Sequence, residues 1–213
     1  MKKYLAELIG TFALVFVGTG SVIVNELSGG SLGLVGISLA FGIITSAMVY
    51  IFGNISGTHI NPAVTIALTI GKQFPVKKAG FYILVQVSGA FLASLLLSII
   101  FPKSQILGVT IPSEGVAQSF VIELVLTFFL MLTILGVTSK KEFTNIAGLL
   151  IGLVVTGLIL FAGPISGGSF NPARSLAPAI ISGNIESLWV YILSPTLGAI
   201  LAILCWKFIN KNI

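Results

Sequence analysis

The chain has 213 residues, of which 56% are hydrophobic and only 8% are charged, and its formal net charge is +5. Soluble domains carry about a quarter charged residues, and a mean hydropathy of +1.12 is too high for a chain that covers itself with polar groups. The composition therefore excludes an ordinary soluble domain and indicates a protein that lies largely in lipid. It does not indicate nucleic-acid binding, because the sequence has no basic patch with interleaved aromatic residues.

Apolar stretches close to the ~20 residues needed to cross a bilayer recur along the chain. The first begins near Met1 and lacks a small-residue cleavage site, so we expect a retained span rather than a signal peptide. Six spans are predicted, at about residues 4–24, 32–52, 79–101, 117–138, 146–163 and 187–208.

The lysines predict the orientation of these spans. With six spans, both termini share a side with the loops after the second and fourth spans. That side would carry Lys2, Lys3, Lys72, Lys77, Lys78, Lys140, Lys141, Lys207 and Lys211. The other side would carry Lys103 with Glu26, Glu114 and Glu186. The positive-inside rule then places both termini in the cytoplasm. Short termini and a single cysteine, Cys205, which excludes an intramolecular disulfide, favour a prokaryotic cell (plasma/inner) membrane.

Asn-Pro-Ala occurs twice, and each copy closes a near-identical run. Residues 55–63 read Ile-Ser-Gly-Thr-His-Ile-Asn-Pro-Ala, and residues 165–173 read Ile-Ser-Gly-Gly-Ser-Phe-Asn-Pro-Ala. The motif residues are Asn61, Pro62, Ala63, Asn171, Pro172 and Ala173. The repeat extends into the spans, where Glu7 matches Glu123 and Tyr82 matches Tyr191. The chain is therefore read as two repeats, residues 1–105 and 106–213, which together form one channel domain.

Each repeat contains three spans, and because three is odd the second repeat must lie upside down relative to the first. Asn is a favoured helix N-cap and Pro suits the first helical position. Each motif therefore opens a short helix, at residues 61–70 and 171–181, of ~15 Å, half the ~30 Å hydrocarbon thickness. The predicted fold class is an all-α membrane protein with six transmembrane helices plus two re-entrant half-helices in two inverted three-helix repeats.

The backbone before each half-helix is expected to be irregular. The residues that suggest this are Gly53, Gly57, Gly163, Pro164, Gly167 and Gly168. Irregular backbone at membrane depth is tolerated only where it is buried in protein or lines water. Broken helices duplicated in an inverted repeat point to a permeation or binding site at the centre.

Such a centre favours neutral solutes over ions. Two helix N-termini, each carrying roughly +0.5 of a charge, would repel a cation at their meeting point. Asn61 and Asn171 would supply amide donors, while the carbonyls of residues 55–60 and 165–170 would supply acceptors to a passing hydrogen-bonding molecule. Arg174 is the only arginine and follows Asn171 by three residues. It is interpreted as a pore residue near an aqueous mouth rather than a snorkelling interface residue.

Two acidic residues lie inside apolar spans. Glu7 and Glu123 could relay protons in a transporter, but their matched positions favour a structural role, in which they accept hydrogen bonds from the half-helix loops. His59 could sense pH, although packing of its ring beside the path is preferred. The sequence shows no metal-ligand spacing, no nucleophile–base set and no cofactor motif. An enzyme is therefore not predicted.

With its two Asn-Pro-Ala loops in inverted three-span repeats, and Ala173-Arg174-Ser175 after the second, the chain resembles an aquaporin of the major intrinsic protein family, of the water-channel type, over essentially its whole length. The resemblance implies six tilted helices, two half-helices, one pore per subunit and a homotetramer in a lipid bilayer. It also implies water and small neutral solutes as the permeants.

The resemblance further implies an aromatic/arginine constriction at Phe41, Ile159, Gly168 and Arg174. Phe41 and Arg174 match the water-selective pattern, whereas strict water channels usually carry histidine where this chain has Ile159. Gly168 lacks the cysteine through which mercurials often block this family. The constriction is expected to be less polar than in a strict water pore, which leaves open whether glycerol, urea, ammonia, peroxide or metalloid acids pass.

Three alternatives to a water channel follow from the same sequence. The first is a broader facilitator of glycerol, metalloid acids or other small neutral solutes, which a glycerol flux assay would identify. The second is an alternating-access secondary transporter, which would show saturable, ion-coupled uptake. The third is a structural junction protein, which would show no flux at all.

Overall fold

The computed structural model describes residues 1–210, and within that range its secondary structure consists of helices, without strands. Six of its helices are long and apolar enough to cross a membrane. These are α1 (Lys2–Leu27), α2 (Gly33–Ser56), α4 (Val76–Ile100), α5 (Val116–Ser139), α6 (Ala147–Ser166) and α8 (Leu188–Ile209). The predicted all-α membrane fold with six spans is thus confirmed. Lys211, one of the predicted cytoplasmic lysines, lies outside the described residues.

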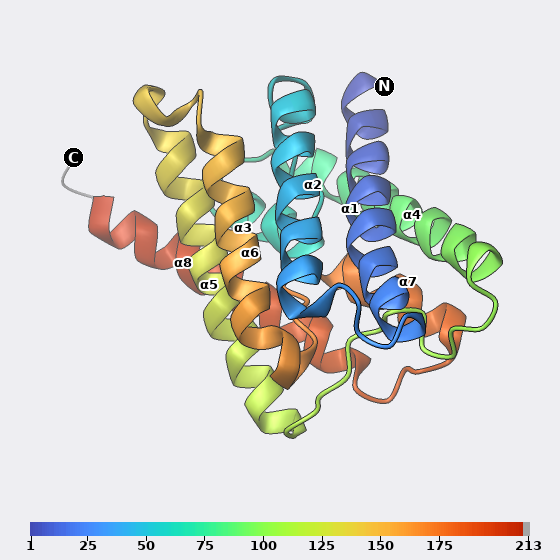
Figure 1. Cartoon of the computed structure of the whole chain (residues 1–213). Coiled ribbons are helices and arrows are strands. Elements are labelled where there is room, and N and C mark those ends of the chain that lie inside the picture. Colours follow the sequence, from blue (N-terminus) through green and yellow to red (C-terminus); the bar gives the residue numbers. More distant parts are fainter. Residues whose placement is uncertain (211–213) are drawn as a thin grey trace.

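Three shorter elements complete the fold: α3 (Pro62–Ile70), α7 (Pro172–Ser182) and the 3-10 turn η1 (Lys141–Phe143). In Figure 1, α1, α2, α5 and α6 stand side by side, while α4 and α8 cross behind them at a steep tilt. Helix α1 packs against α2 and α4, and α5 packs against α6 and α8. Each short helix packs against both α4 and α8, so α3 and α7 lie inside the bundle.

The closest helix crossings are made by glycines. A Cβ on Gly89 of α4 would lie 3.1 Å from the backbone nitrogen of Phe12 on α1. A Cβ on Gly198 of α8 would lie 3.1 Å from the backbone nitrogen of Phe128 on α5. Small residues let the backbones of membrane helices approach each other, and here the two approaches occupy corresponding positions in the two halves.

A third close crossing joins the two halves. A Cβ on Gly42 of α2 would lie 2.6 Å from the carbonyl oxygen of Gly152 on α6, and a Cβ on Gly152 would meet the carbonyl oxygen of Gly42. Ser46 and Thr156, one turn further along each helix, flank this contact. The α2–α6 crossing is therefore built from two equal contributions, one from each half.

The predicted irregular backbone begins later than expected. Helix α2 continues through Gly53, and α6 continues through Gly163 and Pro164, so the expectation of irregular backbone at these three residues is wrong. The last helical turns still close, because the N–H of Gly57 donates to the Gly53 carbonyl and that of Gly167 donates to the Gly163 carbonyl, at 3.0 and 3.1 Å. Pro164 has no N–H to donate, but the last turn of α6 is closed by the N–H of Gly167 instead.

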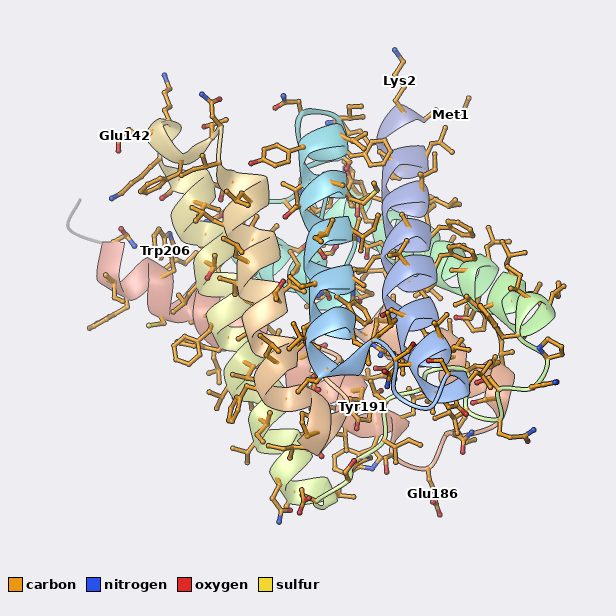
Figure 2. The ribbon with its side chains drawn as sticks, in the orientation of Figure 1. Met1, Lys2, Glu142, Glu186, Tyr191 and Trp206 are labelled. Atoms are coloured by element: carbon orange, nitrogen blue, oxygen red, sulfur yellow. The ribbon has the colours of Figure 1, made fainter. Side chains whose placement is uncertain are left out.

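Charged side chains lie at both ends of the bundle. Figure 2 shows Met1, Lys2 and Glu142 at one end of the long helices and Glu186 at the other. Between the ends, large apolar side chains face outward, as at Ile43 and Ile99, which are 65% and 68% exposed. Such an outward apolar belt suits a lipid environment.

Candidate pore at the meeting point of two half-helices

The two short helices begin at asparagines that perform the same two tasks. The Asn61 Oδ1 accepts the backbone N–H of Ala63 at 2.9 Å, and the Asn171 Oδ1 accepts that of Ala173 at 3.0 Å. Each side chain thus caps its own helix N-terminus. Each Nδ2 also donates across the centre of the protein, from Asn61 to the Phe170 carbonyl and from Asn171 to the Ile60 carbonyl, both at 2.8 Å. The two half-helices therefore meet at their N-termini and hold each other in place.

The loop before each asparagine has an unusual backbone. In the first loop Gly57, Thr58 and Ile60 have φ of 87°, 46° and 41°. In the second loop Gly167, Gly168 and Phe170 have φ of 81°, 60° and 53°. Positive φ costs a non-glycine residue roughly 1–2 kcal/mol, so the fold must supply contacts that hold Thr58, Ile60 and Phe170 in this conformation.

Glu7 provides such contacts for the first loop. Its Oε1 accepts the Ser56 hydroxyl at 2.7 Å and the His59 N–H at 2.9 Å. Its Oε2 accepts the Ile60 N–H at 2.7 Å and the Gln86 side-chain amide at 2.8 Å. The carboxylate is fully buried, and both of its oxygens are occupied.

Glu123 makes the corresponding contacts in the second loop. Its Oε1 accepts the Ser166 hydroxyl at 2.7 Å and the Ser169 N–H at 2.8 Å, and its Oε2 accepts the Phe170 N–H at 2.7 Å. Proline occupies position 195, which corresponds to Gln86, so the amide contact belongs to the first half alone. In both halves a carboxylate from the middle of a span binds the N–H groups of the loop.

Two tyrosines anchor the helix ends that lead into the loops. The Tyr82 hydroxyl donates to the Ser56 carbonyl at 3.0 Å, and the Tyr191 hydroxyl donates to the Ser166 carbonyl at 2.7 Å. His59 lies beside the first of these contacts. Its Nδ1 is 3.0 Å from the Thr65 hydroxyl, and its ring packs against Phe74 and Tyr82 with centroids 4.7 and 5.1 Å apart.

The N–H groups of the two loops donate to side chains of the protein, mainly Glu7 and Glu123, whereas several loop carbonyls have no hydrogen-bond partner. Within residues 1–210, the carbonyl oxygens of residues 57–59 and 167–169 accept no hydrogen bond. Most of these residues are nevertheless buried. Buried carbonyls require a partner such as water.

A cavity of about 620 Å³ is lined by four of these six residues, Gly57, Thr58, His59 and Ser169. One wall is made of the loop residues and the two asparagines. The lining also includes many apolar residues: Leu14, Val49, Val64, Leu68, Leu130, Ile134, Val137, Ile151 and Val155. The cavity runs from a polar rim at Tyr50 and Asn145 to Phe41 and Arg174.

Phe41, Ile159 and Arg174, three of the four residues predicted to form a constriction, line the cavity. The guanidinium is 2% exposed and its carbon lies 5.2 Å from the centre of the Phe41 ring. Ile159 lines the same region, and a Cβ on Gly168 would lie 3.4 Å from its Cγ1. The structure therefore places Arg174 beside Phe41, and Gly168 beside Ile159. The Arg174 Nη1 donates to the Gly108 carbonyl at 2.8 Å, while its Nε has no partner within residues 1–210.

Sequence reasoning missed several residues of the site. Gln86 could have been found, because it is a polar side chain inside an apolar span. Ser56 and Ser166 could also have been found, because both belong to the repeated Ile-Ser-Gly run. Gly108 gave no signal, since its contact with Arg174 joins residues 66 positions apart. Among the described residues no group of His, Cys, Asp and Glu could hold a metal ion.

Comparison with known proteins gives the same picture. The family model described as "Major intrinsic protein" matches residues 1–206. Aquaporin NIP1-1 of Zea mays is 39% identical over 216 residues, which cover 99% of this chain and 77% of that protein. Aquaporin NIP2-1 of Arabidopsis thaliana is 41% identical over 218 residues, covering 98% and 75%.

The fold is also shared with a solved structure. The aquaglyceroporin from Plasmodium falciparum superposes with a TM-score of 0.89 at 24% identity, covering 99% of this chain and 97% of that one. The match to the family model, over residues 1–206, includes the spans, both half-helices and both loops. The chain belongs to the major intrinsic protein family, which makes it a multi-pass membrane protein and a passive channel rather than an enzyme.

Proposed function

We propose that this chain conducts water through the cavity between its two halves while it excludes ions and protons. The observation that supports this most strongly is the set of unpaired carbonyls at residues 57–59 and 169, which line the cavity together with Asn61 and Asn171. Water can exchange hydrogen bonds along such a set at little net cost, because a new bond to the next carbonyl replaces each bond that breaks. The named relatives, which are aquaporins, support the same proposal.

Exclusion of cations follows from the same centre. Helices α3 and α7 direct their N-termini at one point, and each contributes roughly +0.5 of a charge. Both asparagine oxygens cap their own helices and both amides donate into the centre. A cation there would lose its hydration shell and meet the positive ends of both helices. Arg174 adds a full positive charge at the narrow end.

Supporting roles are assigned to Glu7, Glu123 and His59. The two carboxylates hold the loop N–H groups, so that the loop carbonyls face the cavity. His59 lends its backbone to the path, and its ring is held by Thr65 and two aromatic neighbours. In this proposal none of the three carries a proton across the membrane.

We further propose that both termini face the cytoplasm and that four copies assemble in the cell membrane, each with its own pore. The orientation rests on the lysines at the end that holds the chain start. The assembly is supported by family membership.

A broader facilitator of small neutral solutes such as glycerol is the second candidate. Ile159 and Gly168 favour it, because an aliphatic side chain and an absent one leave the narrow end less polar on the side opposite Arg174. The aquaglyceroporin that shares the fold is consistent with this alternative.

One experiment distinguishes these candidates. The purified protein is placed in liposomes, and stopped-flow light scattering follows shrinkage in a sucrose gradient and re-swelling in a glycerol gradient. Fast shrinkage with a lower activation energy than in protein-free liposomes would establish the water channel. Fast re-swelling would establish the broader facilitator, and ion-dependent, saturable flux would instead indicate a secondary transporter.

The control is a variant with a blocked pore. Val155 lines the cavity and is 9% exposed, so Val155→Trp would place an indole ring in the passage and obstruct it. Flux that persists in a correctly folded Val155→Trp protein would place the path elsewhere and contradict the proposal.

A further inference from the structure

The loop between α4 and α5, residues 101–115, passes beside α1 and α7, and we call it the strap. It contains no helix, yet parts of it are as buried as the core, with Leu107 6% exposed. None of its residues, all of which the structure describes, lines the cavity. Its contacts nevertheless lead directly to the constriction.

The strap supplies the hydrogen bond that holds the Arg174 side chain. The Nη1 donates to the Gly108 carbonyl at 2.8 Å, and no other hydrogen bond reaches this guanidinium within residues 1–210. The Phe41 ring lies 5.2 Å from the guanidinium carbon but fixes no N–H direction. The position of the Gly108 carbonyl therefore sets the position of the guanidinium.

Gly108 is itself held tightly. Its φ is +64°, and a Cβ there would lie 2.7 Å from Thr19 Cγ2, so only glycine fits. The preceding Leu107 also has positive φ, 49°, and packs with Ile23 and Leu97. These contacts press residues 107–108 against α1 and α4.

A polar connection leads from this point to the surface. The Leu107 N–H donates to the Ser104 hydroxyl oxygen at 3.2 Å, and that hydroxyl donates to Glu26 Oε2 at 2.9 Å. Glu26 lies in the last turn of α1 and is exposed. A continuous series of contacts therefore runs from Glu26 through Ser104 and residues 107–108 to Arg174.

We propose that Glu26 and Ser104 are positioning residues for the constriction, which restrict the Arg174 guanidinium through the strap without touching the solute. This inference rests on the channel function proposed above. With the Glu26–Ser104 bond in place, the Gly108 carbonyl is fixed and the guanidinium resists displacement by a solute wider than water. Without it, residues 104–108 loosen and the guanidinium yields.

Other contacts keep the rest of the strap in place when this bond is removed. The Thr110 hydroxyl lies 2.7 Å from that of Ser175 on α7, and the Ser113 N–H donates to the Ile165 carbonyl at 2.9 Å. Removal of the Glu26–Ser104 bond should therefore change the constriction without unfolding the loop.

The test compares the ratio of glycerol to water permeability in liposomes that contain equal amounts of protein. Ser104→Ala and Glu26→Ala remove opposite ends of one bond, so either folded variant is sufficient. We expect each to raise the ratio at least about threefold, which is near the low end of the effect of losing one ordinary hydrogen bond. Glu26→Gln keeps an acceptor oxygen and should keep the wild-type ratio. Ser28→Ala, which removes an exposed hydroxyl bonded to Ser31, is the matched control.

A second comparison shows whether the effect passes through Arg174. In an Arg174→Val background, Ser104→Ala should add nothing to the ratio, because the group it positions is gone. The inference is overturned if the wild type conducts water but the single variants leave the ratio of glycerol to water permeability unchanged or lower it. It is also overturned if Ser104→Ala raises that ratio equally in the Arg174→Val background. If the wild-type protein shows no water flux, the proposed channel function is contradicted, and the inference that rests on it is contradicted too.

Discussion

Gly42 and Gly152 face each other where α2 crosses α6, and each lies against the carbonyl oxygen of the other. The two residues occupy corresponding places in the two halves, 110 positions apart in the sequence. Their contact brings together the helices that carry Phe41 and Ile159, so the width of the constriction depends on it.

Substitution at this crossing should be costly. Gly152→Ala would place a methyl group against the Ser46 hydroxyl and the Gly42 carbonyl, so we expect a loss of about 1–3 kcal/mol from overpacking. Thermal unfolding in detergent measures it. Gly157, on the same helix, has open space where its Cβ would lie, so Gly157→Ala should be neutral or gain about 0.5–1 kcal/mol in helix propensity. Equal effects at the two positions would contradict this account of the crossing.

Glu7→Gln should destabilise the first loop although it preserves shape. Glu7 Oε1 accepts the His59 N–H and Oε2 accepts the Ile60 N–H. Whichever oxygen becomes an amide nitrogen, it faces a backbone donor, which leaves a buried N–H unpaired. The expected loss is about 1–3 kcal/mol, measured as a lower unfolding temperature together with reduced water flux. The exposed Glu186→Gln is the matched control. A Glu7→Gln protein as stable as wild type would argue against the role assigned to the carboxylate.

Arg174→Val should weaken the exclusion of charged species. The variant removes the only arginine and its buried positive charge from the narrow end. We expect faster decay of proton or sodium gradients in liposomes, with water flux retained. Lys103→Val, which removes an exposed cation outside the cavity, should leave the gradients as they are. Unchanged leakage in Arg174→Val would show that the two half-helices exclude ions without it.

Ile159→His should make the channel more selective for water. Ile159 lines the cavity next to Gly168, and an imidazole there would add polar atoms beside Arg174. We expect the ratio of glycerol to water permeability to fall, in the same light-scattering assay. Ile159→Leu conserves volume and apolar character, so its ratio should stay near that of wild type. A similar fall in both variants would mean that polarity at this position does not decide the selectivity.

Water flux should be largely insensitive to mercurials. Cys205, the only cysteine, lies on α8, and no described residue of α8 lines the cavity. A thiol must be reachable to react in a way that blocks the path. Thr45→Cys, which places a thiol on the cavity wall, should make the flux sensitive. Strong inhibition of the wild type that disappears in Cys205→Ser would overturn this prediction.

The spans and the half-helices could be predicted because their signals are local. Apolar length predicts the six long helices, and Asn-Pro marks where a helix can begin, as α3 and α7 do. The prediction at Gly53 and Gly163 was wrong, because glycine alone does not break a helix whose hydrogen bonds can continue past it. Pairing across the chain was harder. The bond between Arg174 and Gly108, like that between Ser104 and Glu26, depends on where a loop without secondary structure folds back.

The bonds that Asn61 and Asn171 exchange also bear on how the protein is made. Until the second half has been inserted, the Ile60 carbonyl and the Asn61 amide have no partner at the centre, because both partners come from the second half. A partly synthesised chain therefore contains one half-helix and one wall but no completed passage. We therefore expect permeability to begin only once the second half-helix has joined the first.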